Sequence, residues 1–196
     1  MTNGKQQGES RKELDMKEVQ QYLDYKTILL EEMYSLATIS LQGITDKAGN
    51  PVVKHAMEIA QEFWARGDWY KAVIASLHDV IEDSETITDG HALTRKVEEI
   101  KFGTMRVSEV KKNLINKGHD PEQMGISVHA IVDAVVILTR SEGTTYFDYI
   151  RSIKVSGNKD AIAVKIADLE HHLENGADIP DSLVSRYEKA LDILEK

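Results

Sequence analysis

The chain has 196 residues, of which 41% are hydrophobic and 29% are charged, a composition typical of one globular domain. It has no cysteine, so any metal site must use imidazole and carboxylate ligands. With 24 basic and 33 acidic residues, the formal net charge is -9, which argues against nucleic-acid binding. No apolar run approaches the roughly 20 residues of a membrane span, and the polar N-terminus has no signal-peptide core. We therefore predict a soluble, cytoplasmic protein without a membrane partner.

The predicted secondary structure is almost entirely helical. Apolar residues recur at spacings of three and four along most of the chain, and strand-like alternation is scarce. Residues 1–18 are polar enough to be predicted as a disordered tail, which leaves residues 19–196 as a single all-α domain. The sequence contains no repeat or low-complexity segment, and it makes no prediction of the oligomeric state.

The first two predicted helices flank a turn. The first is expected from about residue 19 to residue 41, where a stripe of apolar side chains has helical spacing. Residues 48–51 then read AGNP, a combination typical of a turn. The second helix follows this turn, carries His55 on its apolar side and ends at Gly67.

A third helix is predicted from about Trp69 through Asp83, because residues 72–77 form an apolar run that can be buried on most sides. Four ionisable side chains follow within six residues: His78, Asp79, Glu82 and Asp83. On a continuous helix each acid of the second pair lies four residues after a member of the first, so the four groups form one acidic edge. Because unpaired buried charge is strongly unfavourable, we expect a cation to compensate them.

The rest of the chain predicts helices at about 91–101, 107–117, 125–140, 144–153, 159–174 and 181–195. Alone, a His-Asp pair is common, and a histidine on a helix is more often structural than a ligand. His55 and Asp168, each on an apolar helix, change this interpretation. Together with His78 and Asp79 they offer two imidazoles and two carboxylates from three helices. Such a set suits a divalent metal with open positions for water and substrate.

Four segments share a wider pattern: AGNPVVKHAMEIA, ASLHDVIEDS, LTRSEGTTYFDYI and AIAVKIADLEHHLEN. They resemble the HD-domain metal-dependent phosphohydrolases, in particular the RelA/SpoT-type (p)ppGpp hydrolase branch and its small stand-alone members. The second segment is similar to the His-Asp-x-x-Glu-Asp-Thr signature of that branch. The similarity spans about residues 36–175, and it implies a single HD-domain helical bundle with a metal site at its centre.

The resemblance also implies residue roles. It places a divalent metal, commonly manganese, on His55, His78, Asp79 and Asp168. Glu82 and Asp83 match the acidic pair that this branch uses to activate and orient the attacking water. The family reaction releases pyrophosphate from the ribose 3′ position of (p)ppGpp. The resemblance thus implies a metal-dependent 3′-pyrophosphohydrolase whose partner is a small phosphorylated nucleotide.

The sequence departs from the family pattern at two positions that contact the nucleotide. Asp46, Lys47 and Ala48 stand where alarmone hydrolases have Arg-Lys-Ser, and an acidic residue cannot reproduce the stacking of a guanidinium on a base. His172 replaces an asparagine four residues after Asp168, so it could bind substrate, donate a proton, touch the metal or lie at the surface. About 40 residues separate HDVIED from VHAIVDAVVILTR, which would reshape the lid over the site.

Candidate substrate contacts in the matching segments are Lys47, Arg140, Tyr146 and His172. Two alternatives stay open beside the alarmone hydrolase. One is an HD phosphohydrolase that acts on another nucleotide or dinucleotide, as the altered base-contact positions would permit. The other is a nucleotide-sensing module in which the His-Asp site is only structural.

Overall fold

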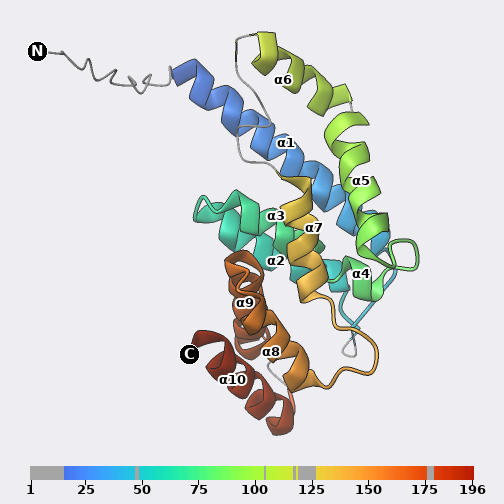
Figure 1. Cartoon of the computed structure of the whole chain (residues 1–196), viewed down its shortest axis with the longest axis vertical. Helices are drawn as coiled ribbons and strands as arrows, with labels where there is room; N and C mark the ends of the chain where they lie inside the picture. Colours follow the sequence, from blue (N-terminus) through green and yellow to red (C-terminus); the bar gives the residue numbers. More distant parts are fainter. Residues whose placement is uncertain (1–15, 47–48, 104, 117, 119–126, 176–178) are drawn as a thin grey trace, which may run out of the picture.

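The computed structural model describes residues 16–46, 49–103, 105–116, 118, 127–175 and 179–196 (Figure 1). Its helices are α1 (Met16–Ser40), α2 (Val52–Ala65), α3 (Trp69–Leu77), α4 (Val80–Asp83), α5 (Gly90–Gly103), α6 (Met105–Asn116), α7 (Val128–Leu138), α8 (Tyr146–Ser156), α9 (Lys159–Asn175) and α10 (Asp181–Glu195). These described ranges contain no β-strand, and Thr45 and Pro51 form only an isolated bridge. The predicted all-α class is confirmed.

Helix α3 lies at the centre of the fold and packs against α1, α2, α7 and α9 (Figure 1). The side chains of residues 72–77 are all buried, as the apolar run predicted. Large neighbours that are fully buried around it include Tyr25, Met33 and Ile59. The central position of α3 means that polar groups at its C-terminal end are held by a closely packed core.

The other helices form two groups at opposite ends of the molecule. Helices α5 and α6 pack along α1, and α5 also contacts α7 (Figure 1). Helices α8, α9 and α10 pack on one another, and α9 also reaches α2 and α3. Helix α9 thus joins the C-terminal group to the centre of the fold, and α8 adds a contact with α7. No helix in the part of the chain that the structure describes is both long and apolar enough to cross a membrane.

The prediction of one continuous helix through residue 83 is wrong at His78 and Asp79. Helix α3 ends at Leu77, α4 begins at Val80, and the two residues between them form a turn. The His78 imidazole Nδ1 donates to the Ala75 carbonyl at 2.7 Å. A continuous helix would use this carbonyl for the Asp79 N–H, so the histidine side chain competes with the helical hydrogen-bond pattern.

Candidate metal centre

Three residues from different elements converge at the centre of the fold. His55 lies on the first turn of α2, His78 in the turn after α3, and Asp168 on α9. Each offers a ligand atom, and these atoms all lie within 4.8 Å of one another. His78 and Asp168 are buried, and His55 is partly buried. The structure therefore brings together three of the four predicted metal ligands.

The Asp168 carboxylate contacts several side chains of this region. Its Oδ1 atom lies 2.7 Å from His55 Nε2, 3.3 Å from His172 Nε2 and 3.9 Å from His78 Nε2. Its Oδ2 atom accepts from the Lys165 ammonium at 2.7 Å. The two carboxylate oxygens thus face in different directions, one toward the imidazoles and one toward the lysine.

The charges of Asp168 and Lys165 stabilise each other. Burial alone would raise the pKa of Asp168, but the Lys165 ammonium and the hydrogen bonds from His172 and His55 hold it well below its usual range. Burial likewise opposes the charge of Lys165, yet the Asp168 carboxylate raises the lysine pKa well above its ordinary value. Asp168 is therefore ionised at neutral pH and available as a ligand.

The hydrogen bonds of His78 fix which of its nitrogens can bind a metal. A carbonyl oxygen only accepts, so the contact with Ala75 places the proton on Nδ1 and leaves a lone pair on Nε2 of the neutral ring. This Nε2 atom lies 3.1 Å from Asp79 Oδ1 and 3.9 Å from Asp168 Oδ1. An imidazole nitrogen that faces two carboxylates can share either a proton or a metal cation with them. A divalent cation fits this donor set, which combines imidazole nitrogen and carboxylate oxygen.

Asp79, the fourth predicted ligand, lies at the edge of this group. It contacts His78, and its side chain keeps 23% of its surface exposed. It does not belong to the three-residue group whose ligand atoms lie within 4.8 Å of one another among the described residues. The geometry therefore assigns Asp79 to the exposed side of the candidate centre.

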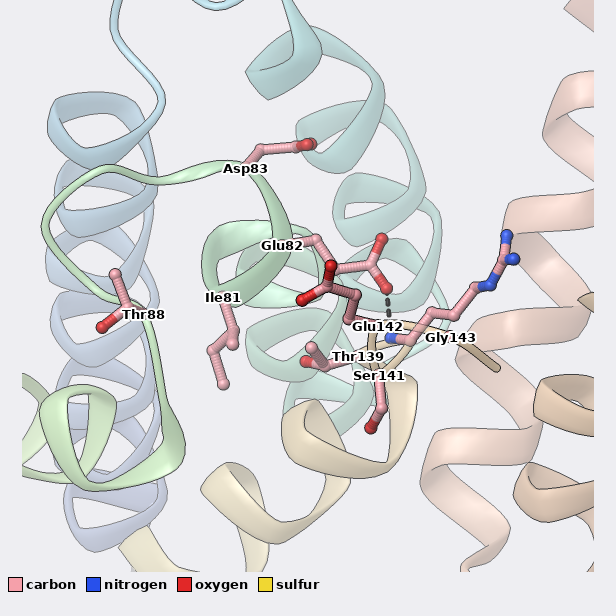
Figure 2. A pocket seen from close by; sticks show the side chains of 9 residues that line it. Ile81, Glu82, Asp83, Thr88, Thr139, Ser141, Glu142 and Gly143 are labelled. Atoms are coloured by element: carbon pink, nitrogen blue, oxygen red, sulfur yellow. Dashed lines mark hydrogen bonds between the residues drawn. The ribbon is translucent and has the colours of Figure 1, made fainter. Parts of the chain in front are cut away.

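The predicted acidic pair, Glu82 and Asp83, lies on the short helix α4. Glu82 and Asp83, on α4, line a cavity of about 590 Å³ whose other wall is formed by residues 139–143 (Figure 2). The Arg140 backbone N–H donates to the Glu82 carboxylate and orients it. Burial raises the pKa of Glu82, against the effect of this N–H, and both burial and the Asp79 charge raise the pKa of Asp83. Both acids lie close along the chain to Asp79, which they follow by three and four residues.

The predicted substrate contacts have different surroundings. Arg140 lines the cavity, but its guanidinium donates twice to the Thr144 carbonyl, at 2.9 and 2.7 Å. His172 stacks between His55 and Tyr187, with ring centroids 4.4 and 5.4 Å away. The remaining two predicted contacts are Lys47, which lies outside the described residues, and Tyr146. The structure therefore places His172 at the candidate centre and Arg140 at the acidic pair.

Tyr146 lies at the start of α8, near the same centre. Burial raises its pKa, and the charges of Lys165 and Asp168 also act on it. Its hydroxyl is buried without a hydrogen-bond partner in the described part of the chain. The Arg186 guanidinium lies 5.5 Å from its ring centroid. Tyr146 is thus partly buried, with its hydroxyl shielded from solvent.

Sequence reasoning missed two residues of this region, Glu58 and His171. His171 Nδ1 lies 3.0 Å from His55 Nδ1, and His171 Nε2 lies 3.1 Å from Glu58 Oε2. Burial, together with the nearby His55, lowers the pKa of His171. The spacing held a signal, because Glu58 follows His55 by three residues and His171 follows Asp168 by three. Residues three apart share one face of a helix.

No protein-family model matches this chain, and no curated protein matches it. The resemblance to HD-domain phosphohydrolases therefore remains a prediction based on short motifs. What bears on it directly is the arrangement of the side chains described above.

Proposed function

We propose that this chain is a metal-dependent phosphohydrolase of the HD type, and that it removes the 3′-pyrophosphate of (p)ppGpp or a related alarmone. One observation carries the proposal. The Nε2 atom of His78, which the hydrogen bond to Ala75 leaves available, faces the carboxylates of Asp79 and Asp168 in a site that also holds His55. This arrangement suits a divalent cation, and the acidic residues Glu82 and Asp83 follow Asp79 by three and four residues.

Four side chains would hold the cation: His55, His78, Asp79 and Asp168. Manganese is the ion that the family resemblance implies, and the mixed nitrogen and oxygen donors suit it. When bound, the cation supplies a Lewis acid for the phosphoryl oxygens and lowers the pKa of a nearby water. Lys165 stabilises the ionised form of Asp168, because its ammonium lies 2.7 Å from Asp168 Oδ2.

Glu82 and Asp83 would handle the water. The Arg140 N–H fixes the Glu82 carboxylate, and the raised pKa of Glu82 makes it a better proton acceptor than an ordinary glutamate. In the reaction a water oxygen bonds to phosphorus and gives its proton to Glu82. The bond from phosphorus to the ribose 3′ oxygen breaks, and that oxygen leaves with a proton. The products are pyrophosphate and the nucleoside 5′-diphosphate, or the 5′-triphosphate when pppGpp is the substrate.

The cavity beside Glu82 supports a small phosphorylated ligand that requires a cation. Its volume of about 590 Å³ falls within the range of ordinary ligand sites. Among the described residues, its lining includes the acidic residues Glu82, Asp83 and Glu142 and one basic residue, Arg140. A phosphate group entering this lining meets net negative charge. Binding is therefore expected to depend on the divalent cation.

A second candidate is the same chemistry on another nucleotide or dinucleotide. His172 stands where the family has a nucleotide-binding asparagine, and its Nε2 lies 3.3 Å from Asp168 Oδ1. The Asp168 hydrogen bond raises the pKa of His172, against the effect of burial. A histidine held by the candidate ligand set cannot pair with a base as an amide does. This observation favours a substrate whose base is recognised differently.

The test is the release of pyrophosphate and phosphate from ppGpp, pppGpp, NADPH and a panel of nucleotides, with manganese and after chelation. Asp79→Ala serves as the blank, and the exposed Glu62→Ala serves as a matched control. Release from ppGpp that is lost in the blank and kept in the control is the result expected for the alarmone hydrolase. Turnover of other nucleotides alone would favour the second candidate. Manganese binding without any turnover would overturn the proposal of an enzyme and favour a nucleotide-sensing module.

A further inference from the structure

A chain of three side chains runs outward from the candidate centre to the surface of α2. His55 Nδ1 lies 3.0 Å from His171 Nδ1, and His171 Nε2 lies 3.1 Å from Glu58 Oε2. The His171 side chain keeps only 12% of its surface exposed, whereas Glu58 keeps 44%. The contacts therefore connect a solvated carboxylate to a candidate metal ligand through a mostly buried imidazole.

The donor and acceptor roles along this chain follow from its outer end. The Glu58 carboxylate only accepts, so the proton of neutral His171 is on Nε2 and its Nδ1 is an acceptor. His171 Nδ1 can therefore accept from His55 Nδ1. In the structure His55 Nε2 lies 2.7 Å from Asp168 Oδ1, which accepts its hydrogen bond. A cation bound at Nε2 would replace that proton, and the neutral His55 ring would then carry its proton on Nδ1, where His171 accepts it.

Helix geometry makes this arrangement possible. On α2, Glu58 follows His55 by three residues, and on α9, His171 follows Asp168 by three. Each helix therefore presents one member of the candidate centre and one outer residue on the same face. Helices α2 and α9 pack against each other, which brings the two faces together.

We propose that Glu58 and His171 are positioning residues that hold His55 in the tautomer able to bind a divalent cation through Nε2. The inference rests on the proposed function, since it assigns His55 as a ligand. Glu58 and His171 lie outside the three-residue group that could hold the cation. They act through the orientation and proton position of His55. Outer residues of this kind typically change metal affinity about 10- to 100-fold when they are removed.

The test is the manganese affinity of the full chain, measured by isothermal titration calorimetry, together with the melting temperature of the metal-free protein. Glu58→Ala should raise the manganese Kd about tenfold or more. Glu62→Ala removes a carboxylate one turn further along α2, where Glu62 pairs only with exposed Arg66 at 3.2 Å among the interactions described. Lys54→Ala controls for the exposed Lys54 pair of Glu58, at 3.7 Å. Both controls should bind manganese as the wild type does.

His171 provides a second and independent test. His171→Leu removes the acceptor for His55 and should weaken manganese binding at least as much as Glu58→Ala. His171→Asn places an amide oxygen near the position of the lost Nδ1 and should recover part of the affinity. A purely structural role predicts instead that both variants lower the metal-free melting temperature without this difference in affinity.

The outcomes separate this inference from the proposed function. Wild-type protein that binds manganese and releases pyrophosphate, with equal Kd in Glu58→Ala and Glu62→Ala, would overturn the positioning role alone. Equal affinity in His171→Leu and His171→Asn would overturn it as well. Wild-type protein that binds no manganese would overturn both proposals. Weaker binding in Glu58→Ala and His171→Leu, with normal binding in the controls, is the expected result.

Discussion

Replacing Lys165 by methionine is expected to destabilise the metal-free protein strongly. The side chain keeps its length but loses the ammonium that lies 2.7 Å from Asp168 Oδ2. This pair is mostly shielded from water, since Lys165 keeps 15% and Asp168 keeps 5% of its side-chain surface exposed. The ammonium also lies 5.4 Å from the centroid of the Tyr149 ring. The substitution therefore leaves a buried carboxylate without its nearest fixed positive charge.

The expected loss follows from this burial. Removing one partner of a buried ion pair typically costs about 3–5 kcal/mol of unfolding free energy. Asp168 keeps contacts with His55 and His172, which partly compensate its charge, so we expect the lower end of that range. Arg66→Ala is the matched comparison, because the Arg66–Glu62 pair is 65% and 50% exposed. An exposed pair of this kind contributes at most about 1 kcal/mol.

The pH dependence of this loss has a definite sign. The pKa of Asp168 is lowered in the folded protein, so its stabilising effect is present above the unfolded pKa of about 3.9 and is lost as the pH falls through the folded pKa. The pKa of Lys165 is raised, so its effect is present below about 10.4 and is lost only at higher pH, through the folded value. The difference between wild type and Lys165→Met should be full at neutral pH and shrink in acid.

Urea unfolding at pH 7.5 with chelator gives the required free energies. Manganese at about 100 times its Kd would stabilise the wild type by about 2.7 kcal/mol. It should restore part of the stability of Lys165→Met, because the cation then compensates Asp168. A loss in Lys165→Met no larger than in Arg66→Ala would refute the reasoning. So would a loss that is unchanged by acid.

Three further predictions concern the acidic pair and one helix cap. Glu82→Gln and Asp83→Asn should each lower turnover about 100-fold or more while manganese still binds, whereas Asp79→Ala should lose both, as kinetics and calorimetry together would show. If Glu82→Gln lost manganese affinity together with turnover, the assignment of Glu82 to the water and not to the metal would be contradicted. Because burial raises the pKa of Glu82 from its ordinary 4.5, the acid limb of the rate profile should lie above that pH, and a limb at or below it would disagree. Ser127 Oγ accepts from the Ala130 N–H at the start of α7, so Ser127→Ala should cost about 1 kcal/mol in urea unfolding, and an unchanged midpoint would count against this cap.

Helical periodicity was sufficient to predict the all-α class and most of the helices. The apolar run of residues 72–77 is buried as predicted, because every side of α3 meets another helix. His55 and Asp168 meet because each lies beside buried apolar residues of its own helix, Ala56 and Leu169 among them. A polar residue on a buried helix face must find a polar partner inside the protein, and this restriction makes its position predictable.

Other features depend on individual hydrogen bonds that no periodicity encodes. The break between α3 and α4 follows from the His78 contact with one carbonyl. The contact between Glu58 and His171 depends on the packing of α2 against α9. Arg140 was expected to reach substrate, but its guanidinium donates to the nearby Thr144 carbonyl. In each case the outcome is set by local competition between polar partners.

The distance along the chain between His55 and Asp168 has a consequence for how the protein matures. These residues are 113 positions apart, yet their side chains meet at 2.7 Å. A chain in which only α1 to α3 have docked holds both ligand imidazoles but lacks the carboxylate that faces them. Contacts between such distant segments close late, because they carry the largest loop entropy. The candidate centre would then be complete only in the fully folded chain, and an ion bound there would slow unfolding by linking the first half of the molecule to the second.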